Sequence, residues 1–140
     1  MGTQAAPIEI RHLTGDQFAI HVRGHELVVD QPSGSDPGSG PTPTELFIAG
    51  LGACVGFYAE RYLRRHDLPL EGLAVTVDHE IGERPARVTS VGIRLALPAG
   101  IPAERLPGLM AVASHCTVHN SLEHPPQVTI KAESPEDAAA

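Results

Sequence analysis

The stretch GPTPTELFIAGLGACVGFYAERYLRR, residues 40–65, decides the fold. Thr42 stands before a proline and three residues before Glu45, which is the Thr-x-x-Glu pattern of a helix N-terminus. Residues 46–57 are apolar or small on every side of such a helix, and charged residues return only in its last two turns. A helix without a polar face is typical of a buried element. We therefore expect a long helix that begins at Pro43 and is buried on every side over its first half.

Outward from this helix, alternating apolar and polar residues predict antiparallel strands. The expected strands are 8–12, 17–22, 25–30, 73–81, 87–97 and 127–132. A loop is expected over 31–43, a second helix over 103–115 with a break at Pro107, and a helical turn over 117–122. This order predicts a single α+β domain over residues 1–140 with antiparallel sheets, and with frayed tails at 1–6 and 134–140.

Composition excludes several classes of partner. The formal net charge is −7, and no basic run is longer than Arg64-Arg65, so nucleic acid is not expected as a partner. The sequence contains no run of about 18 apolar residues, which a membrane span would require, and residues 1–7 lack the pattern of a secretory signal. We expect a cytoplasmic protein. Aromatic residues make up only 4%, so we also expect the core to be completed by oligomerisation.

Two cysteines in a reducing compartment favour redox chemistry or metal binding over a structural disulfide. Cys54 lies in GLGACVG, where it is either a small buried hydrophobe or a nucleophile beside a cleft. Cys116 lies in SHCTVHN, before a predicted helical turn and beside histidines, where a thiol pKa is lowered. The alternatives for Cys116 are a structural cysteine or one ligand of a metal site. That site would use Cys116, His115, His119 and His124.

Two charged residues have a structural interpretation, and Glu45 has a functional one as well. Glu45 is either the carboxylate of a capping box or a group that orients a charged partner near a cleft. Arg23 precedes Gly24 at a turn, and its structural interpretation is a solvated strand end.

The two cysteine segments resemble the motifs of a known family. Residues 40–54 resemble the first cysteine motif of the OsmC/Ohr family (osmotically inducible protein C and organic hydroperoxide resistance protein), GPxPxELxxxxLGAC. Residues 116–122 are similar to its second motif, usually Cys-Pro-x-x-Asn-x-Leu, with Thr117 in place of the proline. The hydroperoxide-resistance branch has its glutamate one position earlier, at Thr44, so Glu45 indicates an OsmC-like branch. The resemblance extends from about residue 17 to about residue 132.

The resemblance implies an intertwined homodimer, with antiparallel sheets wrapped around two long central helices and the active site at the interface. It implies a thiol-dependent peroxidase without metal or flavin, acting on organic hydroperoxides or hydrogen peroxide in oxidative stress defence. Cys54 would attack the peroxide, Cys116 would close a disulfide, and a dithiol such as a lipoylated protein would reopen it. Glu45 would hold Arg23 beside the Cys54 thiolate. The alternatives are a low-turnover OsmC-fold protein that senses redox state or binds a small molecule, and a Cys/His metal-binding protein.

Overall fold

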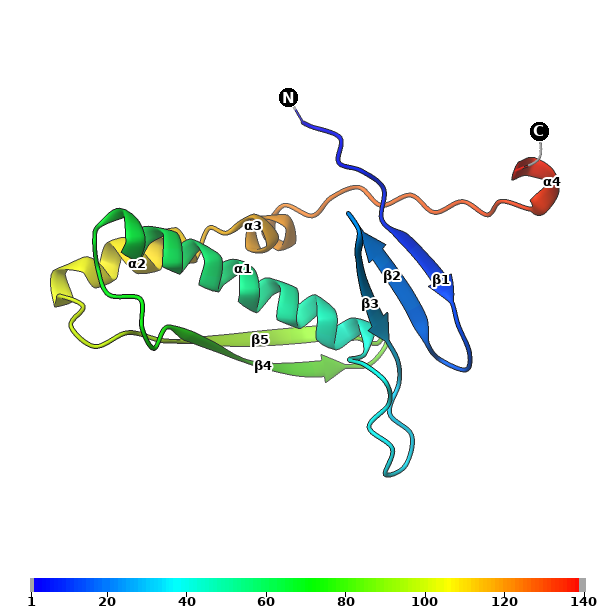
Figure 1. Ribbon diagram of the computed structural model, residues 1–140, viewed down its shortest axis with the longest axis horizontal. Coiled ribbons are helices and arrows are strands. Elements are labelled where there is room, and N and C mark those ends of the chain that lie inside the picture. Colours follow the sequence, from blue (N-terminus) through cyan, green and yellow to red (C-terminus); the bar gives the residue numbers. More distant parts are fainter. Residues whose placement is uncertain (1, 139–140) are drawn as a thin grey trace.

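The computed structural model describes residues 2–138 of the chain, and it has an α+β architecture in which a long helix lies on a β-hairpin (Figure 1). The strands form two antiparallel sheets, as expected. One sheet contains β1 (Glu9–His12), β2 (Phe18–Val22) and β3 (His25–Val29), and the other contains β4 (Ala74–Gly82) and β5 (Arg87–Ala96).

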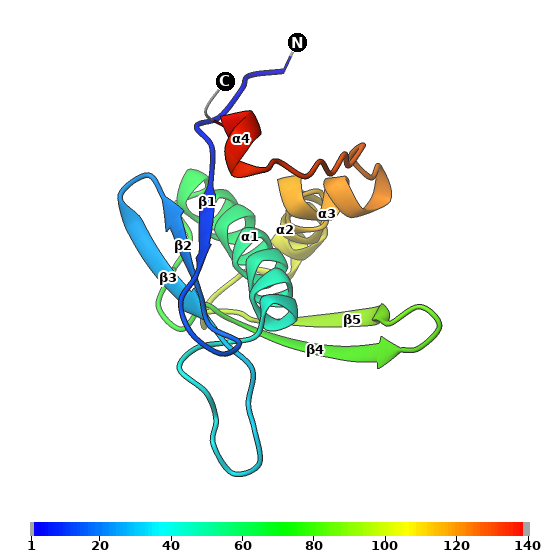
Figure 2. The ribbon, with the colours of Figure 1, turned by 90° about the vertical axis from the view of Figure 1, so that its right-hand side faces the viewer.

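The helices gather on one face of the β4–β5 hairpin (Figure 2). α1 (Pro43–Arg65) packs on β4, and α2 (Leu106–Ala113) and α3 (Thr117–Glu123) pack on α1. A short 3-10 turn, Ala103–Arg105, leads into α2. The break that was expected at Pro107 is therefore observed just before that residue, as a change from 3-10 helix to α-helix. A last helical turn, α4 (Pro135–Ala138), occupies part of the tail that was expected to be frayed.

The N-terminus of α1 confirms the predicted capping box. The Thr42 hydroxyl accepts a hydrogen bond from the Glu45 backbone N–H at 3.0 Å, and the Glu45 carboxylate accepts one from the Thr42 backbone N–H at 2.8 Å. Pro43 occupies the first turn, where its missing N–H costs nothing. The helix ends at Arg65, because Asp67 two residues later adopts the left-handed conformation.

The loop that delivers the chain into α1 is tied down by Asp30. The carboxylate of Asp30 accepts hydrogen bonds from the backbone N–H groups of Gln31 and Ser39, both at 2.8 Å. These bonds lower the pKa of the carboxyl group. The loop predicted over residues 31–43 therefore connects β3 to α1 with a fixed anchor at its start.

Two glycines explain how closely α1 packs on the hairpin. A Cβ atom at Gly52 would lie 2.6 Å from a methyl group of Val77, and one at Gly56 would lie 3.0 Å from a methyl group of Val75. A helix pays about 1 kcal/mol for each glycine relative to alanine. Here the glycines let the helix backbone approach the side chains of β4.

The prediction that the first half of α1 is buried on every side is wrong for the chain as the structure describes it, because the helix is buried on one side only. Ile48, Leu51, Val55 and similar residues face the hairpin and α2. Phe47 and Phe57 remain 45% and 51% exposed, and small residues lie exposed beside them at Ala49, Gly50 and Ala53. A single chain supplies packing layers to only one side of the helix, so an apolar face stays uncovered.

The composition of α1 also bears on the expectation that no segment spans a membrane. Among residues 2–138, α1 is the one helix whose length and mean hydropathy, 1.2, suffice to cross a membrane. The core helix of a soluble protein meets the same criterion. In this chain 33% of the apolar window of α1 is buried, on the face that packs on β4 and α2.

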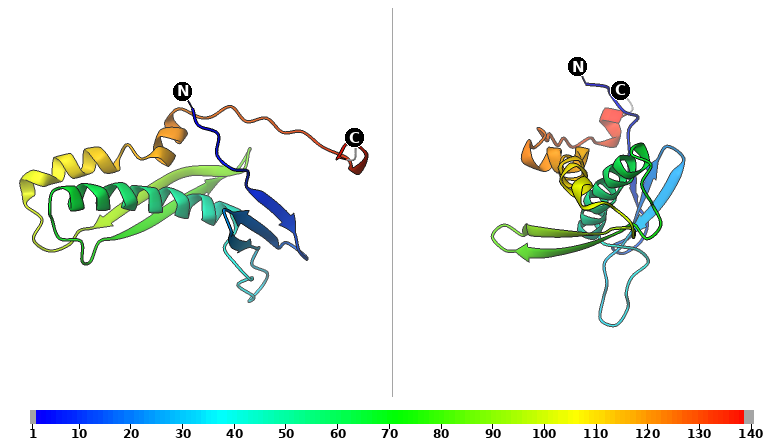
Figure 3. Two further views of the ribbon diagram at one scale, coloured as in Figure 1. Left: turned by 45° about the horizontal axis from the view of Figure 1, so that its top comes forward. Right: turned by 90° about the vertical axis from the view of Figure 1, so that its left-hand side faces the viewer.

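The strand predicted over 127–132 is absent from the described structure. The segment after α3 runs away from the helices in an extended path (Figure 3), and Val128 and Ile130 are 74% and 93% exposed. A strand requires the edge of another strand for its backbone hydrogen bonds. Within residues 2–138 no strand edge pairs with this segment. Residues 1, 139 and 140 of the predicted tails lie outside the described residues.

Candidate functional site

The fold brings the two cysteines together although they lie 62 positions apart (116 − 54). Cys116 belongs to the buried cluster formed with α1 and α2, and Cys54 packs against the same cluster from the middle of α1. Cys54 lies near enough to Cys116 to raise the pKa of the Cys116 thiol. Both are free thiols, Cys116 fully buried and Cys54 half-buried. A reagent can therefore meet Cys54 before it meets Cys116.

Cys116 is also the N-cap residue of α3. Its sulfur accepts a hydrogen bond from the His119 backbone N–H at 3.3 Å. Sulfur thus replaces the hydroxyl or carboxylate oxygen usual at this position. The cap orients the thiol at the start of the helix.

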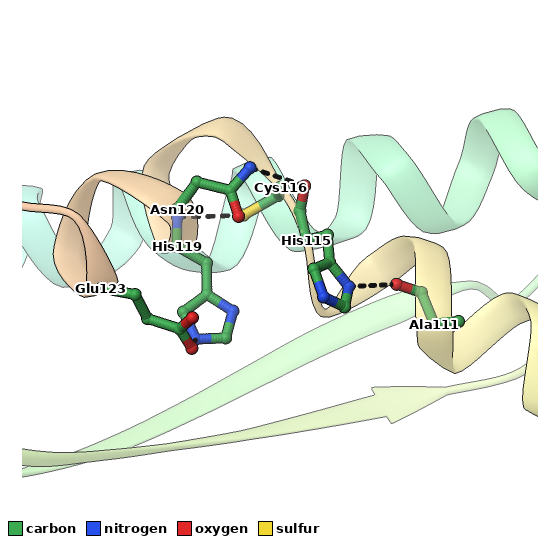
Figure 4. A network of polar contacts seen from close by, with 6 residues as sticks. All are labelled: Ala111, His115, Cys116, His119, Asn120 and Glu123. Atoms are coloured by element: carbon green, nitrogen blue, oxygen red, sulfur yellow. Dashed lines mark hydrogen bonds and ion pairs between the residues drawn. The ribbon is translucent and has the colours of Figure 1, made fainter.

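The pKa of Cys116 is raised, which differs from the sequence expectation. Burial has the largest effect, because it disfavours the thiolate. The hydrogen bond from His119 N–H opposes it, but the neighbouring Cys54 thiol raises the pKa further. The imidazoles that were expected to help point elsewhere: His115 Nδ1 lies 2.7 Å from the Ala111 carbonyl oxygen and His119 Nε2 lies 3.0 Å from Glu123 Oε1 (Figure 4).

This shift predicts the reactivity of Cys116. At pH 7.5 iodoacetamide should modify Cys116 at least about tenfold more slowly in the native protein than in urea, because the thiol is buried and neutral. In Cys54→Ser the pKa of Cys116 should fall, since a neighbouring thiol is one cause of its rise, and alkylation of Cys116 should accelerate. Mass spectrometry of the Cys116 peptide measures both rates. Equal rates in native and unfolded protein would contradict the buried position.

The sign of the pH effect on stability follows from the same shift. A thiol with a raised pKa in the folded state stabilises the fold fully below its ordinary value of 9.0. This contribution is lost as the pH rises from there through the raised pKa.

The metal-site alternative is not supported by the part of the chain that the structure describes. Among residues 2–138 no three His, Cys, Asp or Glu side chains lie together as they would around a metal ion. The proposed ligands diverge because the ring of His115 turns to α2 while the ring of His119 turns to the C-terminal end of α3. The carboxamide of Asn120 donates to the His115 carbonyl at 3.2 Å and closes the turn around Cys116 (Figure 4).

Glu45 and Arg23 lie apart from the cysteine pair. Glu45 is exposed, and its recorded hydrogen bond closes the capping box. It also lines a hollow of ≈ 450 Å³ between α1 and β4, together with Ala49, Ala53 and His79. Arg23 has φ 48° in the turn between β2 and β3, is exposed, and lines a separate hollow with Glu9, Arg11 and His21. Within residues 2–138 no contact between Arg23 and Cys54 is recorded.

A larger apolar cleft of ≈ 540 Å³ lies between α1, β5, α2 and α3. Leu51 and Val55 line it from α1, Ile93 and Leu95 from β5, and Met110 from α2. Ser114 and His119, which flank Cys116 in the sequence, also line the cleft, although neither cysteine does. The cleft therefore opens beside the cysteine pair and not onto it.

Sequence reasoning missed a polar contact next to Cys116. The Tyr58 hydroxyl lies 2.9 Å from the Thr117 hydroxyl. Tyr58 is one helical turn beyond Cys54, and Thr117 follows Cys116 directly. The spacing of Tyr58 from Cys54 was visible in the sequence, but the docking of α3 that brings Thr117 there was not.

Comparison with solved structures supports the fold. An OsmC-like protein from Mycoplasma pneumoniae superposes with a TM-score of 0.76 at 13% identity, over 87% of this chain and 89% of the other. An organic hydroperoxide resistance protein OsmC from Legionella pneumophila gives 0.60 at 19% identity, over 86% and 91%. An OsmC-like hydroperoxide resistance protein from Jannaschia gives 0.55 at 20% identity, over 89% of each chain.

The family comparison agrees with the cysteine motifs and with the fold. No curated protein matches the chain significantly by sequence. The family model described as OsmC-like protein matches residues 35–131, which include both cysteines, α1, the β4–β5 hairpin, α2 and α3. With most of its length matched in this way, the chain belongs to the OsmC-like protein family.

Proposed function

We propose that this protein is a cysteine-dependent peroxidase that reduces hydroperoxides through a Cys54–Cys116 disulfide. The observation that carries the proposal is that the two free thiols, one half-buried and one fully buried, pack in the same core cluster within the family-matched region. Neighbours in the family fold that are named for hydroperoxide resistance support it.

The first step uses the more accessible sulfur. The Cys54 sulfur attacks one peroxide oxygen, the O–O bond breaks, and the products are a sulfenic acid on Cys54 and an alcohol, with the thiol proton passing to the alkoxide. The sulfur is oxidised and the peroxide is reduced. Since Cys54 is the half-buried member of the pair, peroxide reaches it first.

The second step closes the disulfide. The Cys116 sulfur attacks the sulfur of the Cys54 sulfenic acid, the S–O bond breaks, and the departing hydroxide leaves as water with the Cys116 proton. An external dithiol, such as a lipoylated protein, then reduces the disulfide. Because the pKa of Cys116 is raised, this thiol is protonated at neutral pH, and it loses its proton as it attacks the sulfenic sulfur.

We propose organic hydroperoxides as preferred substrates over hydrogen peroxide, because the mostly apolar cleft beside the cysteine pair can hold the organic part of the substrate while the peroxide group lies outside it, at Cys54. A panel of hydrogen peroxide, tert-butyl hydroperoxide, cumene hydroperoxide and a fatty-acid hydroperoxide tests this, with dihydrolipoamide or a monothiol as reductant. Consumption should be fastest with the apolar substrates and with the dithiol. If the protein consumes all four hydroperoxides no faster than free cysteine does, the proposed function is overturned.

We also infer that two copies form the intertwined dimer in which the uncovered face of α1 is buried. The exposed Phe57 and Ala53 on α1, and the unpaired segment around Val128 and Ile130, support this assembly. Cys54 lies next to the uncovered face along the helix. We propose that Arg23, held by Glu45 as the family resemblance implies, stabilises the Cys54 thiolate in this dimer, and that the second copy supplies this arginine. The two free thiols suit a reducing cytoplasm, where we propose that the protein acts.

The dimer predicts a hydrodynamic result. Sedimentation equilibrium should give twice the chain mass of 14.8 kDa. Ala53→Arg should shift the equilibrium to monomer, because it places a charge in the apolar face. Glu71→Arg, on the exposed turn before β4, is the matched control and should remain dimeric. A monomer for the unmodified chain at ~100 μM, where a specific complex of micromolar Kd is formed, would contradict the inference.

A further inference from the structure

A hydroxyl pair joins the two helices that carry the cysteines. Tyr58 extends from α1 and its hydroxyl lies 2.9 Å from the hydroxyl of Thr117, the first residue of α3. Among residues 2–138 this is the one recorded hydrogen bond or ion pair between side chains of α1 and α3. α3 is only seven residues long, and the chain beyond it is exposed. The anchoring of α3 therefore depends on few contacts.

The hydroxyl pair lies close to the cysteines along both helices. Tyr58 is four residues after Cys54, which places both side chains on one face of α1. Thr117 follows Cys116, whose thiol caps α3. Thr117 occupies the first helical position, where a proline would set φ but provide no hydroxyl.

We propose that Tyr58 and Thr117 are positioning residues that hold the Cys116 thiol against Cys54 and so set the rate of disulfide closure. This proposal rests on the proposed function for its role in turnover. In the closing step the Cys116 sulfur must approach the Cys54 sulfenic sulfur opposite the departing oxygen, and a proton leaves Cys116 as water is released. Fixing α3 on α1 raises the effective concentration of one thiol at the other, because the attacking sulfur is already oriented.

Tyr58→Phe and Thr117→Val remove the hydrogen bond and keep the shapes of the side chains. Each should lower the effective concentration of the dithiol about three- to tenfold, the range expected for one hydrogen bond. The squared concentration of reduced glutathione divided by the concentration of oxidised glutathione at half-oxidation, which has units of concentration because two glutathione thiols form from each disulfide, measures this quantity without any peroxide. Disulfide closure after one equivalent of cumene hydroperoxide should slow by the same factor, while the consumption of that equivalent should keep its rate.

Three further variants separate positioning from general loss of structure. Thr117→Ser keeps the hydroxyl and should restore the unmodified values. Tyr58→Phe/Thr117→Val should lose no more than either single variant, because both remove one interaction. Tyr62→Phe, which removes a hydroxyl one turn further along α1 beside Gly108, is the matched control and should behave as the unmodified protein.

The outcomes distinguish this proposal from the proposed function. Unchanged glutathione equilibrium and closure rate in Tyr58→Phe and Thr117→Val would overturn the positioning role, even if peroxide is consumed. Failure of every protein to consume hydroperoxide would overturn the peroxidase function, while a shifted glutathione equilibrium would still support positioning. If Thr117→Val fails to fold, the comparison of Thr117→Ser with Tyr58→Phe decides the question.

Discussion

Cys54→Ser should abolish hydroperoxide turnover, with a loss of at least about 10³-fold, because a serine hydroxyl is not ionised at neutral pH and cannot accept the peroxide oxygen as sulfur does. The substitution replaces sulfur with oxygen in a half-buried side chain at the edge of the core, so the fold should persist. Loss of cumene hydroperoxide with dihydrolipoamide present measures turnover. Circular dichroism confirms that the variant is folded.

Cys116→Ser is the matched control within the thiol pair. It should consume one equivalent of hydroperoxide per Cys54, because no second thiol lies beside the sulfenic acid to close a disulfide. Further consumption should stop when the external dithiol reacts only slowly with that sulfenic acid. Dimedone should trap that acid on Cys54, as mass spectrometry would show. If the unmodified protein and Cys54→Ser consume several hydroperoxides equally slowly, the chain is not a peroxidase, and a redox-sensing or ligand-binding role of the OsmC fold would replace it.

Leu109→Ala should lower the free energy of unfolding by about 2–5 kcal/mol, which is the range for removing a fully buried leucine. Leu109 is 0% exposed and packs in the same cluster as Leu63, Val55 and Cys116. The substitution leaves a cavity where α2 meets α1, so Cys116 loses part of its cover. Urea unfolding followed by circular dichroism, at one fixed protein concentration, measures the change.

The control for Leu109→Ala is its neighbour Met110, which is 48% exposed. Met110→Ala should cost no more than about 1 kcal/mol, because little apolar area is lost from the core. Leu109→Ala should also speed the alkylation of Cys116, whereas Met110→Ala should leave it unchanged. Equal effects of the two substitutions on stability would show that α2 does not pack on α1 through Leu109.

Local patterns in the sequence predicted most of the elements correctly. The start of α1 is specified by three residues close together in the chain, Thr42, Pro43 and Glu45, because capping depends on neighbours along the chain. The alternation of side chains over 73–81 and 87–97 specified the β4–β5 hairpin for the same reason. The strand predicted over 127–132 failed because its pattern is local but its pairing partner is not.

The candidate site was less predictable than the elements that form it. The motifs singled out Cys54 and Cys116, and the structure brings the two thiols together. The sequence suggested a lowered pKa for Cys116 because helix starts and histidines favour thiolates. The structure reverses the direction, because burial depends on how α2 and α3 close over the thiol. Whether Arg23 serves Cys54 remains a prediction.

By itself the sequence determined the local chemistry of this protein. It specifies which residues cap α1, which positions of α1 are glycines, and which two thiols the chain contains. Only the tertiary structure decided what those residues meet. It brought Cys116 to Cys54 across 62 positions and Tyr58 to Thr117, and it left one face of α1 uncovered. The physical reason is that capping and strand alternation depend on neighbours along the chain, whereas burial and thiol pairing depend on which surfaces pack together in space.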